Sequence, residues 1–218
     1  MTTVLHLDCS ANHSAESVSR RLTREYADRW LAAHSSADYH YRDLAADPIT
    51  PIDTAYCQLG RRSESLGTLP TEAIEELAET PAEKEAWRLT KPLIDEVRSA
   101  ELLLIGTPLY NYSLPGALKT WIDRVSFPGA FTGGVLEDTQ VVVITASGGA
   151  YGAGSPREGW DHQTPYLRAY FTNHGVRDLK FIQAELTLTG LVDSLAYLKP
   201  LADASLAQAW DEVTLAST

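Results

Sequence analysis

The chain has 218 residues, 44% of them hydrophobic, which is enough for one large domain with a single core. Its formal net charge of −11 argues against nucleic acid or an anionic membrane surface as a partner, because both need clustered Lys and Arg. The two cysteines, Cys9 and Cys57, form no CxxC pair and no apolar run is long enough to cross a membrane, so we expect a reduced cytoplasmic protein without disulfides.

Short apolar or alternating runs predict five strands, at residues 3–7, 38–43, 102–107, 140–145 and 179–183. The second run is the most polar, which is typical of a strand at or near a sheet edge. The run at 102–107 begins with unbroken apolar residues, and this pattern predicts burial on both faces of the sheet.

Apolar residues at helical spacing separate these strands. They predict one helix that begins near Ser17 and one that follows Ser113 as its capping residue. Four further helices are predicted at 71–79, 82–98, 164–174 and 195–213. The segment 44–68 contains prolines and a polar Arg-Arg-Ser-Glu-Ser tract, so we expect an irregular connection there.

The alternation of strands and helices predicts an α/β fold of three layers. We expect a five-stranded parallel sheet in the flavodoxin-like order 2-1-3-4-5, with helices on both faces. No repeat or linker divides the chain, so residues 1–218 are expected to form a single domain. Ligands of such folds lie beyond the carboxyl ends of the strands, where three unusual loops of this chain are expected.

The first of these loops, residues 10–19, is rich in serine where a helix begins. A helix start presents free N–H groups and the positive end of the helix dipole, and the hydroxyls of Ser10, Ser17 and Ser19 would add donors. A phosphate group therefore suits this loop. A second interpretation stays open, in which Ser14 or Ser17 only caps the helix.

The second loop is Pro108-Leu109-Tyr110-Asn111-Tyr112, at the exit of the third strand. The amide of Asn111 both donates and accepts, which matches the edge of a heterocycle that carries C=O and N–H groups. The two tyrosine rings suit a flat ligand, although packing at a junction of helix and sheet explains them equally well.

The third loop follows the fourth strand as Ala146-Ser147-Gly148-Gly149 and continues to Gly154. Its glycines allow backbone amides to approach a ligand closely. The spacing is not that of a dinucleotide-binding fingerprint, and a flexible surface loop is the other interpretation.

Together and in this order, the three loops resemble those of the bacterial FMN-dependent NADH:quinone oxidoreductases and azoreductases. The matching segments are the Ser10 turn, Arg42–Pro48, Pro108–Tyr112 with its continuation Leu118–Asp123, and Ala146–Gly149. The resemblance extends from Val4 to the end of the chain, and it is most specific in Pro108–Tyr112.

The resemblance implies where bound FMN would lie. It implies that the FMN phosphate lies at the first loop, the flat ring in the second and the pyrimidine edge at the third. The implied binding residues are Ser10, Ser17, Val18, Ser19, Pro108, Leu109, Tyr110, Asn111, Tyr112, Ala146, Ser147, Gly148 and Gly149. Relatives often have Arg where Ser147 stands and His where Tyr151 stands, and Tyr151 is a candidate donor to a carbonyl of the reduced flavin. No residue is expected to act as a nucleophile.

The resemblance also implies an activity. NADH would reduce the flavin and leave, and a quinone or an azo compound would then take its place, which is a ping-pong two-electron scheme. Members of the family are homodimers with two flavin sites at the interface. The connection at 131–138 is shorter than is typical, and this difference affects the mouth of the pocket.

Two alternatives come from other functional classes. A flavodoxin-type electron carrier would also be acidic, but such carriers are usually smaller and lack the extra helical segments at 44–98. A regulatory domain that keeps the fold without a flavin is the other alternative.

Hydrolase and metal sites are not indicated. There is no GxSxG motif, and the six histidines show no ligand spacing, so each is expected to be a lone surface or turn residue. Four of the five tryptophans are expected to pack in the core or an interface, whereas Trp160, just past the third loop, is a candidate neighbour of the flavin.

Overall fold

The computed structural model describes residues 2–13, 15–67 and 69–217. Five parallel strands form one sheet in the order β2-β1-β3-β4-β5, which confirms the predicted topology. The strands are β1 (Thr3–Asp8), β2 (Asp38–Asp43), β3 (Leu102–Pro108), β4 (Gln140–Ala146) and β5 (Asp178–Ala184). β2 is an edge strand and every residue of β3 is buried, as the two patterns predicted.

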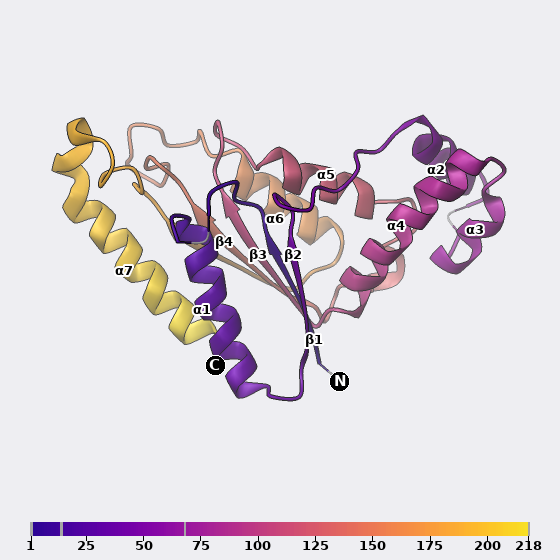
Figure 1. The fold of residues 1–218 in the computed structure, drawn as a ribbon, viewed down its shortest axis with the longest axis horizontal. Coiled ribbons are helices and arrows are strands. Elements are labelled where there is room, and N and C mark those ends of the chain that lie inside the picture. Colours follow the sequence, from indigo (N-terminus) through magenta and orange to yellow (C-terminus); the bar gives the residue numbers. More distant parts are fainter. Residues whose placement is uncertain (1, 14, 68, 218) are drawn as a thin grey trace.

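Helices cover both faces of the sheet (Figure 1). One face carries α1 (Val18–Ala33) and α7 (Lys199–Ala216), and the other carries α4 (Pro81–Ser99), α5 (Gly116–Val125) and α6 (Gln163–Asn173). α2 (Thr54–Ser65) and the single-turn α3 (Ile74–Leu77) pack beside α4. The described residues also form 3₁₀ turns at Thr71–Ala73, Thr132–Gly134 and Asp193–Leu198.

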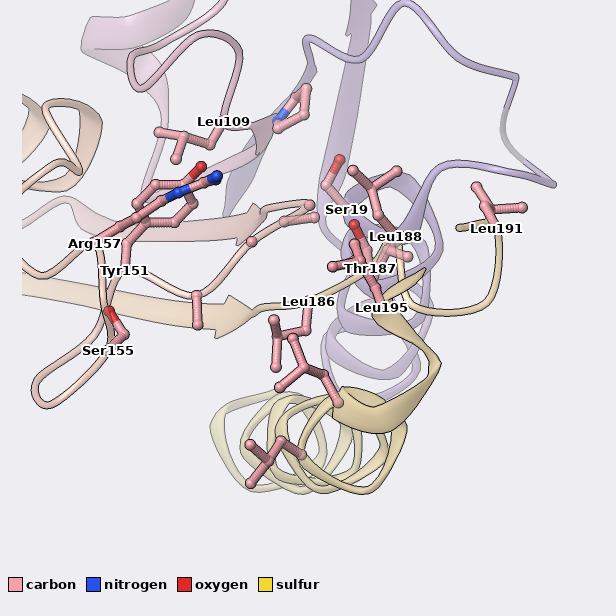
Figure 2. Close-up of a pocket in the computed structure, with 18 of the residues that line it drawn as sticks. Ser19, Leu109, Tyr151, Ser155, Arg157, Leu186, Thr187, Leu188, Leu191 and Leu195 are labelled. Carbon is pink, nitrogen blue, oxygen red and sulfur yellow. The ribbon is translucent and has the colours of Figure 1, made fainter. Parts of the chain in front are cut away.

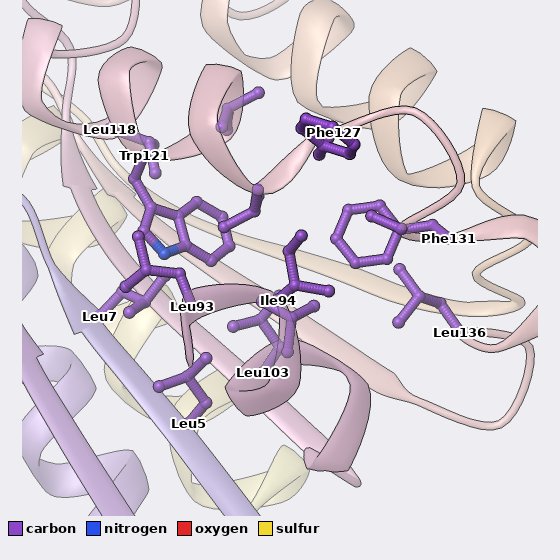
Figure 3. Close-up of a cluster of buried hydrophobic side chains, with 14 of the residues drawn as sticks. Leu5, Leu7, Leu93, Ile94, Leu103, Leu118, Trp121, Phe127, Phe131 and Leu136 are labelled. Carbon is purple, nitrogen blue, oxygen red and sulfur yellow. The ribbon is translucent and has the colours of Figure 1, made fainter. Parts of the chain in front are cut away.

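The period-2 alternation of the strands divides the core between the two faces. Leu5 and Leu103 face the larger cluster, which surrounds the fully buried Trp121 of α5 (Figure 3). Leu102 and Leu104 face the opposite way and pack with Tyr26 of α1 and with α7. Both faces of the central strands are therefore buried, which explains their unbroken apolar sequence.

The prediction of an irregular segment at 44–68 was wrong, because the segment contains α2. Asp53 caps this helix by accepting from the amide of Tyr56 at 2.9 Å. Tyr56 and Leu59 then turn to the core, and the Tyr56 hydroxyl donates to the carbonyl of Asp123 at 2.9 Å. The polar tract near the end of α2 hides this short apolar face, so tertiary packing decides the helix.

Two other predictions about helix ends were also wrong. Ser113 does not cap α5, because it pairs with Tyr110 in a two-residue turn and the helix begins at Gly116, after Pro115. The closing helix starts at Lys199 rather than Leu195, since the turn Asp193–Leu198 is 3₁₀. None of the described helices combines the length and the apolar character that crossing a membrane requires.

Candidate functional site

A cavity of about 810 Å³ opens at the carboxyl ends of β1, β3 and β4. Its wall contains most of the residues that the sequence singled out: Ser10, Ser17, Val18, Ser19, Pro108, Leu109, Tyr110, Ala146, Gly148, Gly149 and Tyr151. Figure 2 shows Ser19 and Tyr151 on opposite sides of this cavity. Asn111, Tyr112 and Ser147 do not line it. The volume falls within the roughly 300–1,000 Å³ of typical ligand sites.

The first loop presents free donors at one end of the cavity. Ser17 is the N-cap of α1 and accepts from the amide of Arg20, while its hydroxyl lies 3.2 Å from that of Ser19. The amides of Val18 and Ser19 bond to no acceptor in the described part of the chain. These donors and the positive end of the helix dipole suit an anion. Ser14, the other candidate cap, lies outside the described residues.

A buried arginine, Arg20, holds this loop in place by hydrogen bonds. The Arg20 guanidinium donates twice to Asp43, at 2.8 and 2.7 Å, and twice to the carbonyl of Ser10, at 3.2 and 2.5 Å. These bonds to Arg20 lower the pKa of the Asp43 carboxyl below its ordinary value. Asp8, only 4% exposed, lies 3.7 Å from the same guanidinium. Ser10 is therefore held by a charge network that no local sequence pattern indicated.

The packing around Asp8 leaves no room for a side chain at Gly106 of β3. A Cβ atom on Gly106 would lie 2.3 Å from Oδ1 of Asp8 and 2.8 Å from the Thr23 methyl. His6, expected to be a surface or turn residue, is instead buried on β1, and its Nδ1 lies 2.8 Å from the Tyr39 hydroxyl. The prediction for His6 was wrong because the rings of Tyr39 and Tyr41 on β2 pack against its side chain.

The second loop folds back through a strained turn. Tyr110 and Ser113 exchange backbone hydrogen bonds, and the residues between them have positive φ angles, 48° at Asn111 and 71° at Tyr112. A positive φ is costly for a tyrosine and is found mostly where surrounding structure enforces it. The Tyr110 hydroxyl accepts from the amide of Ala11 at 3.2 Å, so this turn is tied to the first loop.

The turn directs Tyr112 away from the cavity wall and toward two other rings. Its ring meets Tyr151 edge-on at 6.1 Å and Trp160 at 5.4 Å between centroids. Trp160 is half exposed and does not line the cavity itself. These three rings stand beside the third loop as one aromatic group.

The third loop supplies donors at the opposite end from the serines. The amides of Gly148 and Gly149 find no acceptor among the described residues. The Ser147 hydroxyl donates to the carbonyl of Gly149 at 2.8 Å, which shapes the loop from outside the cavity. Glu185, after β5, accepts from the amides of Tyr151 and Gly152 at 2.6 and 3.1 Å. Its sequence neighbourhood gave no sign of this role.

One wall of the cavity was missed by sequence reasoning. It is apolar and comes from the segment after β5, with Leu186, Leu188, Leu191, Leu195, Leu198 and Leu201 in the lining. Figure 2 shows several of these leucines gathered on the side next to α7. The only sequence signal was the leucine-rich composition of this segment, which resembles that of a core helix.

Comparison with known proteins identifies the family. The family model described as the flavodoxin-like fold matches residues 2–205. The chain belongs to this family. A flavodoxin-like protein from Nocardia farcinica is 42% identical over 97% of this chain and 95% of its own length, and one from Parafrankia is 36% identical over 94% and 93%. Both are named FMN-dependent NADH:quinone oxidoreductase.

Solved structures show the same flavodoxin-like fold. An FMN-dependent NADH-azoreductase from Bacillus anthracis, solved in complex with FMN, superposes over all of this chain and 98% of its own, with a TM-score of 0.78. An azoreductase from the Sterne strain of the same organism gives a TM-score of 0.81. The identities are 19% and 17%, so these likenesses bear on the fold alone.

Proposed function

We propose that this protein is an FMN-dependent oxidoreductase that takes reducing equivalents from NADH and reduces quinones and azo compounds. The observation that carries the proposal is a cavity at the switch point of a flavodoxin-like sheet, with backbone donors at both ends that bond to no acceptor among the described residues. The names of relatives that align over nearly the whole chain support the same activity. In this proposal residues 1–218 act as one domain, and a single cavity serves both the nicotinamide and the acceptor.

The residues fit FMN in their chemistry. Ser10, Ser17 and Ser19, with the amides at the start of α1, would hold the phosphate although the net charge of −11 repels anions. Pro108–Tyr110 and the leucine wall form apolar sides for a flat ring. Asn111, Tyr112 and Ser147 would shape the second and third loops rather than form the cavity wall.

The chain contributes binding, orientation and electrostatics. When bound, FMN supplies two-electron transfer between the nicotinamide and the acceptor. The amides of Gly148 and Gly149 are preorganised to stabilise negative charge at the pyrimidine edge, and the Tyr151 hydroxyl is a further donor there. Because both substrates would use one cavity, they would enter in turn, which is ping-pong behaviour. No side chain is needed as a nucleophile.

We also propose a cytoplasmic homodimer with the cavity at the subunit interface. The rim of the cavity exposes large apolar side chains, with Leu191 81% and Tyr197 76% accessible. A second copy that covers this rim would bury them and roof the flavin. The free cysteines Cys9 and Cys57 suit a reducing compartment.

An anaerobic titration tests the activity. The purified protein is loaded with FMN, NADH is added in steps, and a quinone follows, while the absorbance of the bound flavin is recorded. We expect the flavin band to bleach with NADH and to recover with the quinone. A band that NADH leaves unchanged would indicate an electron carrier, and failure to take up FMN would indicate a domain without a flavin.

A further inference from the structure

Two of the described residues that line the cavity carry a charged side chain, Glu16 and Arg157. Glu16 belongs to the serine-rich first loop. Arg157 lies just past the end of the third loop, and Figure 2 shows it beside Tyr151, across the cavity from Ser19. The end of the cavity away from the serines therefore has one cationic side chain within the described part of the wall.

Among the described residues, Arg157 has no partner for its charge. Its guanidinium makes no ion pair or hydrogen bond within residues 2–13, 15–67 and 69–217. Other described cations, such as Arg21 and Arg61, also form no ion pair, but they do not line the cavity as Arg157 does. The two carboxylates bound to the same loop are used elsewhere, since Glu158 accepts from the amide of Gly154 at 2.8 Å and Glu185 accepts from the amides of Tyr151 and Gly152.

The guanidinium lies where the third loop meets the cavity. A Cβ atom on Gly149 would lie 3.3 Å from Nη1 of Arg157 and 3.4 Å from the Tyr151 hydroxyl. Gly149 has no side chain, so both polar groups converge over its backbone. A cation and a hydroxyl are thus available to one ligand at this point.

We propose that Arg157 binds an acidic substituent of the electron acceptor, so that the cavity favours flat acceptors that carry a sulfonate or carboxylate. This inference rests on the proposed function. The serines and helix amides suffice for the phosphate, and the amides of Gly148 and Gly149 suffice for the pyrimidine edge. Arg157 is the cationic side chain of the described wall, and neither of these two roles uses it. Because the net charge of −11 repels anions, acidic acceptors need such a local cation.

Steady-state kinetics with a matched pair of acceptors test this role. The pair is 1,2-naphthoquinone and 1,2-naphthoquinone-4-sulfonate, each at saturating NADH. For Arg157→Met we expect KM for the sulfonate to rise about tenfold or more, the loss of a charge-assisted hydrogen bond, and KM for the neutral quinone to change less than about twofold. Arg157→Lys should retain part of the preference, and added salt should weaken it.

Readouts other than turnover separate this role from a structural one. The dissociation constant of the sulfonate for the oxidised protein should rise in Arg157→Met, while FMN affinity and the flavin midpoint potential stay unchanged. Arg61→Met, a change at an exposed arginine of α2 outside the cavity wall, is the matched control. It should alter none of these values.

Each of the following results would overturn the assignment. Equal changes for both quinones, or a shifted midpoint potential, would mean that Arg157 acts on the bound flavin. A rise in KM for NADH alone would mean that it binds the nicotinamide substrate. A wild-type protein that reduces both quinones without preferring the sulfonate contradicts only this inference, whereas one that reduces neither contradicts the proposed function as well.

Discussion

The two ends of the cavity are built on different principles. At the serine end, the loop is fixed by buried charges: Arg20, 7% exposed, donates to Asp43 and to the carbonyl of Ser10 above buried Asp8. At the glycine end, the third loop changes from buried at Ala146 to exposed at Gly154, and it is held by carboxylates on its backbone amides, chiefly that of Glu185.

This difference separates retention of the cofactor from choice of substrate. A network of buried charges is costly to disturb, because a buried charge without its partner is strongly destabilising. Such a network suits a phosphate that stays bound through every cycle. A loop held by carboxylates that are not fully buried tolerates sequence change, which suits the part of the cavity that meets varied acceptors.

Removal of Arg20 should have the largest effect. Arg20→Met leaves Asp8 buried without its cation and Ser10 without its donors, so we expect a loss of about 3–5 kcal/mol in the free energy of unfolding. Denaturant unfolding measures it. Arg24→Met, at an exposed pair with Asp28 on the same helix, should cost less than about 1 kcal/mol.

The variant Arg20→Lys distinguishes the effect on folding from the effect on FMN binding at the serine end. It keeps the charge but loses the paired bonds, so the protein should fold while FMN affinity falls. Equal stability of the methionine variants at Arg20 and Arg24 would remove the contrast between the two ends of the cavity.

Removal of a hydroxyl at the serine end should weaken the binding of FMN but not that of riboflavin. Ser19→Ala removes one donor to the phosphate, and we expect FMN to bind roughly 10–100-fold more weakly, the value of a hydrogen bond to a charged group. Riboflavin lacks the phosphate, so its affinity should not change. Fluorescence titration of both flavins measures this, with Ser36→Ala in an exposed turn as control. Equal weakening of both would place the phosphate elsewhere.

Loss of an anchor at the glycine end should affect substrates more than the cofactor. Glu185→Ala frees the amides of Tyr151 and Gly152, and we expect KM for the quinone to rise severalfold while FMN affinity changes less than about threefold. Steady-state kinetics and flavin titration give the two values. Glu64→Ala, an exposed change on α2, should alter neither. A larger loss of FMN than of substrate would reverse the comparison.

The smallest expected effect is on stability at low pH. Because the pKa of Asp43 is lowered in the folded state, its pairing with Arg20 stabilises the protein above the ordinary carboxyl value of 3.8. This contribution is lost as the pH falls through the lowered pKa. Unfolding measured from pH 7 downward should therefore show the gap between the wild type and Asp43→Asn narrowing below pH 3.8. A gap that stays constant with pH would contradict the pairing, and Asp28→Asn serves as the exposed control.

Local patterns were sufficient wherever one physical requirement dominated. The apolar run at 102–107 had one stable placement, at the centre of a parallel sheet, and the alternation of elements then limited the strand order. The glycines of the third loop likewise indicated close backbone approach. α2 escaped prediction because its core contacts, such as that of Tyr56 with Phe127, come from the connection after α5, far along the chain.

The sequence by itself determined the layers, the strand order and three loops at one edge of the sheet, because hydrophobic period and turn residues act over short distances. Only the tertiary structure decided that Arg20 supports Ser10, that Glu185 holds the third loop and that Arg157 faces the cavity unpaired. These contacts join residues from different elements, and charge pairing over such separations leaves no periodic trace in a sequence.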